Sequence, residues 1–73
     1  MRYLSAENRD TDDFGVAFTK KVGEHVYDGA TYRGPWATMS ETSWKVHGCG
    51  VLGTGRGQKY RRSAEGHLVK VGG

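Results

Sequence analysis

The chain has 73 residues, a single cysteine and a formal net charge of +3. A chain of this length forms one domain at most and buries only about 60–65% of its unfolded surface, so it has no room for a deep, enclosed cleft. One cysteine excludes an internal disulfide, and no apolar run approaches the roughly 18–20 residues of a membrane span. We therefore expect a soluble, intracellular, monomeric protein.

The charges are distributed unevenly along the chain. Residues 1–13 hold two arginines against four carboxylates, a net charge of −2. Residues 42–73 have a net charge of +5, from Lys45, Arg56, Lys59, Arg61, Arg62 and Lys70 against Glu65. This asymmetry predicts an acidic partner for the C-terminal part, either a nucleic acid or a protein.

The N-terminal residues lack apolar periodicity and end in the polar run from Asn8 to Asp13. Such a composition is typical of unstructured termini, so we expect a flexible tail over residues 1–13 and one small β-rich domain over residues 14–71. From Phe14 to Thr19, large side chains alternate with small ones. This is the period of a half-buried strand.

A first hairpin is predicted over residues 24–33. Residues 24–27 have the composition of a strand, and Asp28-Gly29 is a strong turn signal because a type I′ turn needs positive φ at both central residues. Residues 30–33 are then the return strand. Pro35 cannot donate to a ladder, so we expect this strand to end, or to lie at an edge of the sheet, at Gly34-Pro35.

A short helix is predicted between Ser40 and Gly48. Ser40 can accept hydrogen bonds from the first turn, and Glu41 complements the helix dipole. Gly48 is suited to end the helix in a left-handed conformation. Because about two helical turns are unstable without packing, Trp44 is its expected buried residue, more buried than Trp36.

The C-terminal part is predicted to be a glycine-rich loop followed by a second hairpin. The loop covers residues 48–57, and the two strands, residues 58–62 and 67–71, flank a turn at Ser63–Gly66. Gly66 suits the positive-φ position of that turn. The predicted class is therefore α+β: a small antiparallel sheet of four to five short strands, one short helix and a flexible N-terminal tail.

The residues from Gly48 to Gly53 have the spacing of a dinucleotide-binding fingerprint. That fingerprint needs a strand before it and a helix that opens at its third glycine. Here a predicted helix precedes it and Thr54-Gly55-Arg56-Gly57 follows, so we interpret the segment as a connection. The backbone N–H groups around Thr54–Arg56 remain candidates for a small anion-binding nest.

His47 and Cys49 are the candidates for metal or thiol chemistry, with His25 or His67 as further ligands. Structural zinc sites usually contain two or more cysteines, and a nucleophilic cysteine needs a histidine and a third, orienting group. The sequence has no second cysteine for a zinc site and identifies no third, orienting group for a nucleophilic cysteine. We predict no metal, no cofactor and no catalytic residue.

The most informative candidates are cationic and aromatic side chains that we expect to contact a partner: Trp36, Lys45, Arg56, Lys59, Tyr60, Arg61 and Arg62. Strand alternation puts Lys59 and Arg61 on one face and Tyr60 and Arg62 on the other. Arg and Tyr on a small sheet are typical of single-stranded nucleic-acid binders. Binding of an acidic protein surface fits the same residues equally well, and a solvated face with Tyr60 in the core is the third interpretation.

Residues 32–73 resemble the small early proteins of tailed bacteriophages, in particular a short transcription regulator of a Xanthomonas phage. The resemblance is carried by Gly34–Ser40, Gly53–Arg62 and Gly66–Gly73. It implies a protein that binds the multisubunit RNA polymerase of the host, inhibits initiation by displacing sigma factor, and promotes antitermination. It also implies action in the host cytoplasm, without enzymatic activity or metal. The alternative is a small basic domain that binds single-stranded nucleic acid.

Overall fold

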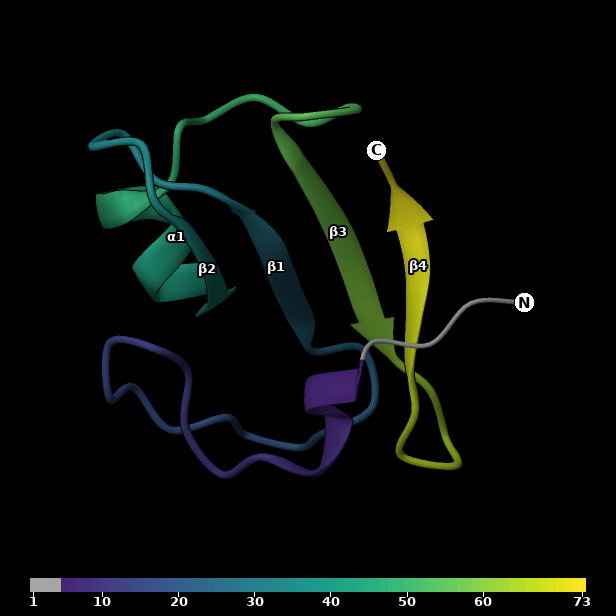
Figure 1. The fold of residues 1–73 in the computed structure, drawn as a ribbon. Helices are drawn as coiled ribbons and strands as arrows, with labels where there is room; N and C mark the ends of the chain where they lie inside the picture. The colour runs from purple at the N-terminus through teal and green to yellow at the C-terminus, as the bar shows by residue number, and fades with distance from the viewer. Residues whose placement is uncertain (1–4) are drawn as a thin grey trace.

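A computed structural model describes residues 5–73, which form a four-stranded antiparallel sheet with one α-helix (Figure 1). The predicted α+β class is confirmed. The strand order is β2-β1-β3-β4. The elements in chain order are η1 (Ser5–Asn8), β1 (His25–Ala30), β2 (Trp36–Ser40), α1 (Glu41–His47), β3 (Gly57–Arg62) and β4 (Leu68–Gly72).

The first hairpin turns later than predicted, because Asp28 and Gly29 lie inside β1. Gly29 is opposite Ala37 on one side and Gly57 on the other. A Cβ at Gly29 would lie 2.8 Å from the Gly57 Cα, so this glycine permits the close approach of two strands. The chain reverses instead at residues 31–35, where Gly34 has φ of +109°. The return strand is therefore Trp36–Ser40, and the predicted strand at residues 30–33 is wrong.

The predicted strand at Phe14–Thr19 is also wrong. This segment forms only an isolated bridge between Thr11 and Ala17. The Asp12 carboxylate accepts hydrogen bonds from the Phe14 and Val16 amides, both at 2.9 Å, and curls the chain back on itself. The alternation of side chains therefore reflects an Asx-type turn rather than a pleated strand.

Of the expected tail, residues 1–4 lie outside the described part of the chain, and residues 5–13 pack against the sheet. Ala6 joins a buried cluster, and Asp12 is buried. Asp13 exchanges hydrogen bonds with the Thr38 backbone, and the Ser40 amide donates to Asp12 at 2.9 Å. Residues 5–24 are called the N-terminal arm below, and Asp12 and Asp13 join this arm to the outer edge of β2.

The helix has the predicted bounds, but its C-terminal glycine plays a different role from the one expected. The Ser40 hydroxyl caps α1 by accepting from the Ser43 amide at 3.2 Å. Gly48 ends the helix with φ of −69°, so the expected left-handed conformation is wrong. A Cβ at Gly48 would overlap the Trp44 ring. The packing of Trp44 thus explains Gly48. Trp44 is more buried than Trp36, as predicted, but it is only half-buried, and the buried residue of α1 is Ser43.

Each face of the sheet carries its own small core. On the arm face, defined as the face covered by the N-terminal arm, the cluster contains Ala6, Phe18, Val26, Tyr60 and Leu68. On the opposite face, called the helix face, Tyr27, Ala37 and Met39 pack with Trp44 of α1. The Tyr27 and Trp44 rings stack with centroids 4.8 Å apart. Figure 1 shows α1 beside β2 and β1, whereas β3 and β4 extend beyond it.

The second hairpin, β3–β4, agrees with the prediction. The Gly66 amide donates to the Ser63 carbonyl at 3.0 Å, and Gly66 has φ of +89°. This local turn chemistry therefore suffices to set the hairpin.

A buried ion pair joins this hairpin to the arm. The Arg62 side chain is only 2% exposed and its Nη2 lies 3.0 Å from Oε1 of Glu24, which is 8% exposed. Arg62 Nη1 also donates to the carbonyls of Glu7 at 2.7 Å and Gly66 at 3.0 Å. Within the described residues no buried side-chain nitrogen or oxygen lacks a partner. One guanidinium thus binds three segments: η1 in the arm, the residue that precedes β1, and the β3–β4 turn.

Replacement of Arg62 by leucine should lower the free energy of unfolding by about 3–5 kcal/mol, because Glu24 would remain buried without its countercharge. The matched control is Arg61→Leu on the same strand, where the side chain is exposed and the expected change is within about 0.5 kcal/mol. Urea denaturation of both variants measures the difference. Equal losses would contradict a special role for the buried pair.

The arm should also make stability fall in acid. Burial raises the pKa of Asp12, but hydrogen bonds from Ser43, Ser40, Val16 and Phe14 outweigh it, so the pKa lies below its ordinary value. A carboxyl whose pKa is lower folded than unfolded stabilises the fold at neutral pH, and this stabilisation is lost as pH falls below about 4.

Asp12→Asn should therefore lower stability at pH 7 by about 1–3 kcal/mol and flatten the decline below pH about 4. The control is Glu65→Gln in the exposed β3–β4 turn, which should leave the pH profile unchanged. Urea midpoints between pH 7 and pH about 2.5 provide the measurement. An Asp12→Asn profile parallel to that of the unmodified chain would refute the assignment.

Candidate functional site

The predicted alternation along β3 is confirmed, but the two faces differ from expectation in their exposure. Tyr60 lies opposite Val26 and is 4% exposed in the arm-face cluster. Arg62 is 1% exposed as a residue and is held by Glu24. Neither side chain presents a surface to a partner, so the assignment of Tyr60 and Arg62 as contact residues is corrected. Their burial has long-range causes: the arm supplies the apolar cover and the carboxylate.

Lys59 and Arg61 face the other way, on the helix face of β3. Lys59 lies opposite Tyr27, and its Nζ is 5.8 Å from the centroid of that ring. Arg61 is exposed and lies between His25 of β1 and Val69 of β4 in the sheet register. Because α1 packs on β2 and β1, the helix leaves Arg61 exposed, whereas Lys59 is half-buried near Leu52 of the α1–β3 loop. We call Lys59 and Arg61 with their neighbour Val69 the basic face.

The remaining predicted residues do not all join the basic face. Trp36 lies on the arm-face side of β2, where its Nε1 donates to the Asp28 carboxylate at 2.7 Å and the residue is 48% exposed. Lys45 is exposed on α1, and Arg56 is exposed in the loop before β3. The structure therefore puts Lys59, Arg61 and Lys45 on one side of the sheet and separates Trp36 from them.

Most carboxylates of the described residues pair or form hydrogen bonds with other groups of the chain, some of them at the surface. Asp10 pairs with Lys20 and Asp13 with Arg9, both at 2.8 Å, and Glu7 lies 3.0 Å from His67. The hydrogen bond with His67 lowers the pKa of Glu7, and the Lys20 ammonium lowers that of Asp10. Glu24 pairs with Arg62, Asp12 accepts backbone amides, and Asp28 accepts from Trp36.

Many cations, by contrast, have no acidic partner. Within residues 5–73, the lysines and arginines that form no ion pair with a carboxylate are Lys21, Arg33, Lys45, Arg56, Lys59, Arg61 and Lys70. All but Lys21 belong to the part of the chain after β1. In the described part of the folded chain most carboxylates therefore have partners, whereas most lysines and arginines have no acidic partner and can attract other molecules.

The glycine-rich segment behaves as a loop, as predicted. It connects α1 to β3, and no helix begins at Gly53. The Arg56 and Gly57 amides both donate to the Gly53 carbonyl at 3.0 Å, so the Arg56 amide is already used within the turn. The Arg56 amide is therefore not available to the suggested anion-binding nest.

His47 and Cys49 are directed to different neighbours. The Cys49 Sγ lies 3.5 Å from the carbonyl oxygens of Val51 and Arg56, whereas the His47 ring stacks on Phe14 with centroids 4.0 Å apart. Among residues 5–73 no group of three or more His, Cys, Asp or Glu side chains is arranged to hold a metal ion. The described part of the chain also has no helix long and apolar enough to cross a membrane.

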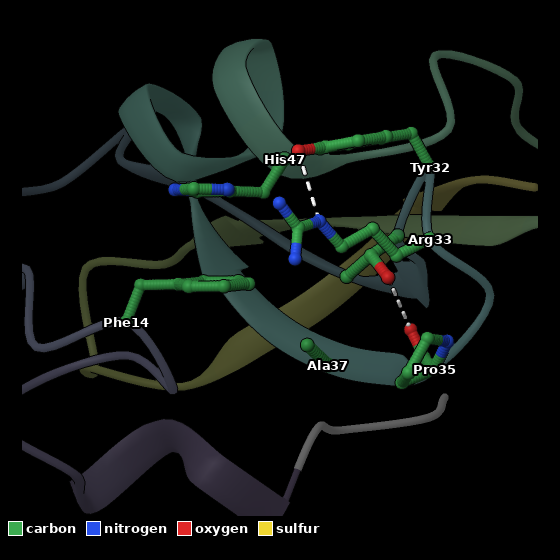
Figure 2. A pocket seen from close by; sticks show the side chains of 7 residues that line it. Phe14, Tyr32, Arg33, Pro35, Ala37 and His47 are labelled. Atoms are coloured by element: carbon green, nitrogen blue, oxygen red, sulfur yellow. Dashed lines mark hydrogen bonds between the residues drawn. The ribbon is translucent and has the colours of Figure 1, made fainter.

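A pocket that the sequence did not reveal lies at the β2 edge of the sheet. Its volume is about 400 Å³, and Figure 2 shows the side chains that surround it. They come from the arm, the β1–β2 turn, β2 and the last residue of α1: Phe14, Tyr32, Arg33, Pro35, Ala37 and His47, together with Thr31. The sequence pattern predicts one strand at Phe14 and another at Tyr32–Arg33, and it contains no signal that places these residues beside His47.

Comparisons with protein-family models, with curated proteins and with solved structures found no match to this chain.

Proposed function

We propose that this chain is a non-catalytic bacteriophage regulator that binds the RNA polymerase of its bacterial host, inhibits initiation by displacing sigma factor, and promotes antitermination. The observation that supports it most is the sorting of charge. Carboxylates hold the fold together while Lys59, Arg61 and Lys45 stand on one side of the sheet without acidic partners. Together with the resemblance of residues 32–73 to phage regulators, this favours an acidic surface on a large host assembly as the target.

On the basic face itself, the positions of the aromatic residues favour a protein target over a single strand of nucleic acid. A stacking platform needs exposed rings beside the cations that track the phosphates. Tyr60 lies in the core on the opposite face from Lys59 and Arg61, and Trp36 also lies on that opposite side. The basic face therefore offers charge and an aliphatic neighbour, Val69, rather than stacking rings. This composition suits electrostatic attraction to an acidic protein surface.

The proposal predicts that tagged protein retains the large polymerase subunits from nuclease-treated host extract. In transcription with purified components, it should inhibit sigma-dependent initiation and raise readthrough at terminators. Recovery of no polymerase subunit would refute the proposal. If the protein instead binds labelled single-stranded oligonucleotides alone, with affinity that falls steeply as salt rises, the nucleic-acid alternative is correct.

Reversal of the charge at Arg61 should weaken polymerase binding at least about tenfold, because an attractive contact becomes a repulsive one. Lys21→Glu is the matched control, since it makes the same charge change at an exposed residue of the arm that is not part of the basic face. Competition binding with purified polymerase measures both variants, and urea denaturation checks that both are folded. If the two variants bind equally, the basic face is not the contact.

A further inference from the structure

The pocket at the β2 edge is held open by contacts that do not depend on a ligand. Its turn is tied to the end of the helix, because the Tyr32 amide donates to the His47 carbonyl at 2.8 Å. The Thr31 amide and hydroxyl both donate to the Pro35 carbonyl, at 2.9 Å and 2.8 Å. Phe14 is fixed by the hydrogen bond that its backbone amide donates to the Asp12 carboxylate and by the stacking of its ring on His47. A ligand would therefore meet a preformed site.

The pocket exposes apolar side chains that the fold does not cover. Phe14 is 41% exposed and Tyr32 is 61% exposed. Pro35 is exposed beside them, and Ala37 forms a buried part of the lining. Large side chains that leave this much apolar surface around one hollow typically mark a place where another molecule binds.

Arg33 adds a cation to this apolar site. Its Nε donates to the Tyr32 hydroxyl at 3.1 Å and its guanidinium lies 5.5 Å from the Tyr32 ring centroid. Figure 2 shows the far end of the guanidinium directed toward the stacked rings of Phe14 and His47. No carboxylate of residues 5–73 pairs with it. The two terminal nitrogens can therefore bind a carboxylate in a bidentate pair.

The polar groups of the pocket favour a peptide over a nucleotide. Recognition of a base needs donors and acceptors that are free to meet its edge. Here the backbone amides and the hydroxyl already donate within the fold. The Thr31 hydroxyl and amide donate to the Pro35 carbonyl, the Tyr32 amide donates to the His47 carbonyl, and the Gly34 amide donates to the Thr31 carbonyl. Beside the Tyr32 hydroxyl and the His47 ring, the pocket offers one cation and a mainly apolar lining.

We infer that this pocket is an anchor site for an acidic peptide segment of a protein partner. In this inference a carboxylate side chain of the segment pairs with Arg33, and a neighbouring large apolar side chain lies against Phe14, Pro35 and Ala37. The site is at the β2 edge of the sheet, whereas the basic face is on β3, so it goes beyond the proposed function. It also does not depend on the partner being RNA polymerase.

The test is a titration of the ¹⁵N-labelled full chain with the blocked peptide acetyl-Glu-Trp-Glu-amide, followed by amide chemical shifts. The expected shifts are confined to Phe14, residues 31–37 and His47. Acetyl-Gln-Trp-Gln-amide, which keeps the ring and loses the charges, should bind at least about tenfold more weakly. Adenosine monophosphate, which has an anion and a planar ring, should also bind more weakly than the acidic peptide.

Arg33→Gln removes the cation from an exposed side chain without touching the core, and it should weaken the acidic peptide at least about tenfold. Phe14→Ala should weaken both peptides, and its amide spectrum shows whether it is folded. Lys21→Gln, a loss of the same charge outside the pocket, should have no effect. The inference is overturned by an absence of shifts at about 10 mM peptide, by shifts that centre on Lys59 and Arg61, or by equal binding of the neutral peptide or the nucleotide.

Discussion

The guanidinium of Arg62 is the group on which the rest of this fold depends. Three segments far apart in the chain meet at it: the Glu7 carbonyl of η1, the Glu24 carboxylate before β1, and the Gly66 carbonyl of the last turn. Each face of the sheet has only a small apolar cluster, so packing alone specifies the position of the arm weakly. Arginine suits this role because its planar fork satisfies several acceptors at once.

The internal use of carboxylates determines what the surface can do. Glu24 serves Arg62 and also accepts from the Thr19 and Lys20 amides at 2.6 Å and 3.0 Å, while Asp12 ties the arm to the start of α1. These groups cannot neutralise the cations of β3 and α1. The acidic N-terminal part has the composition of a flexible tail. In the structure it packs on the arm face, and its carboxylates hold it there. Because these carboxylates are engaged within the arm and its contacts, the cations of β3 and α1, apart from Arg62, are left without acidic partners among the described residues.

The elements fixed by neighbours in sequence could be predicted, and those fixed by distant partners could not. Ser40 and Gly48 bound the helix, and Gly66 sets the last turn, through contacts within a few residues. Asp28-Gly29 has the local signature of a turn, yet β2 and β3 pair with it on both sides and keep it extended. This is a tertiary override of a local preference. The strand predicted at Phe14–Thr19 is wrong for the opposite reason: the nearby Asp12 carboxylate imposes a turn on a segment with an alternating pattern.

The same distinction explains the candidate sites. Alternation along β3 separates Lys59 and Arg61 from Tyr60 and Arg62, but it does not say which face the arm will cover. The pocket joins Phe14 to His47 across the chain, a pairing with no signature in sequence. Both sites belong to the helix face, with α1 packed on the strands between them. A partner that reaches from Arg33 to Arg61 must therefore also meet α1, where Lys45 and Val46 are exposed. If one partner contacts both proposed sites, α1 is the element that lies between the apolar anchor and the positive charge of the basic face.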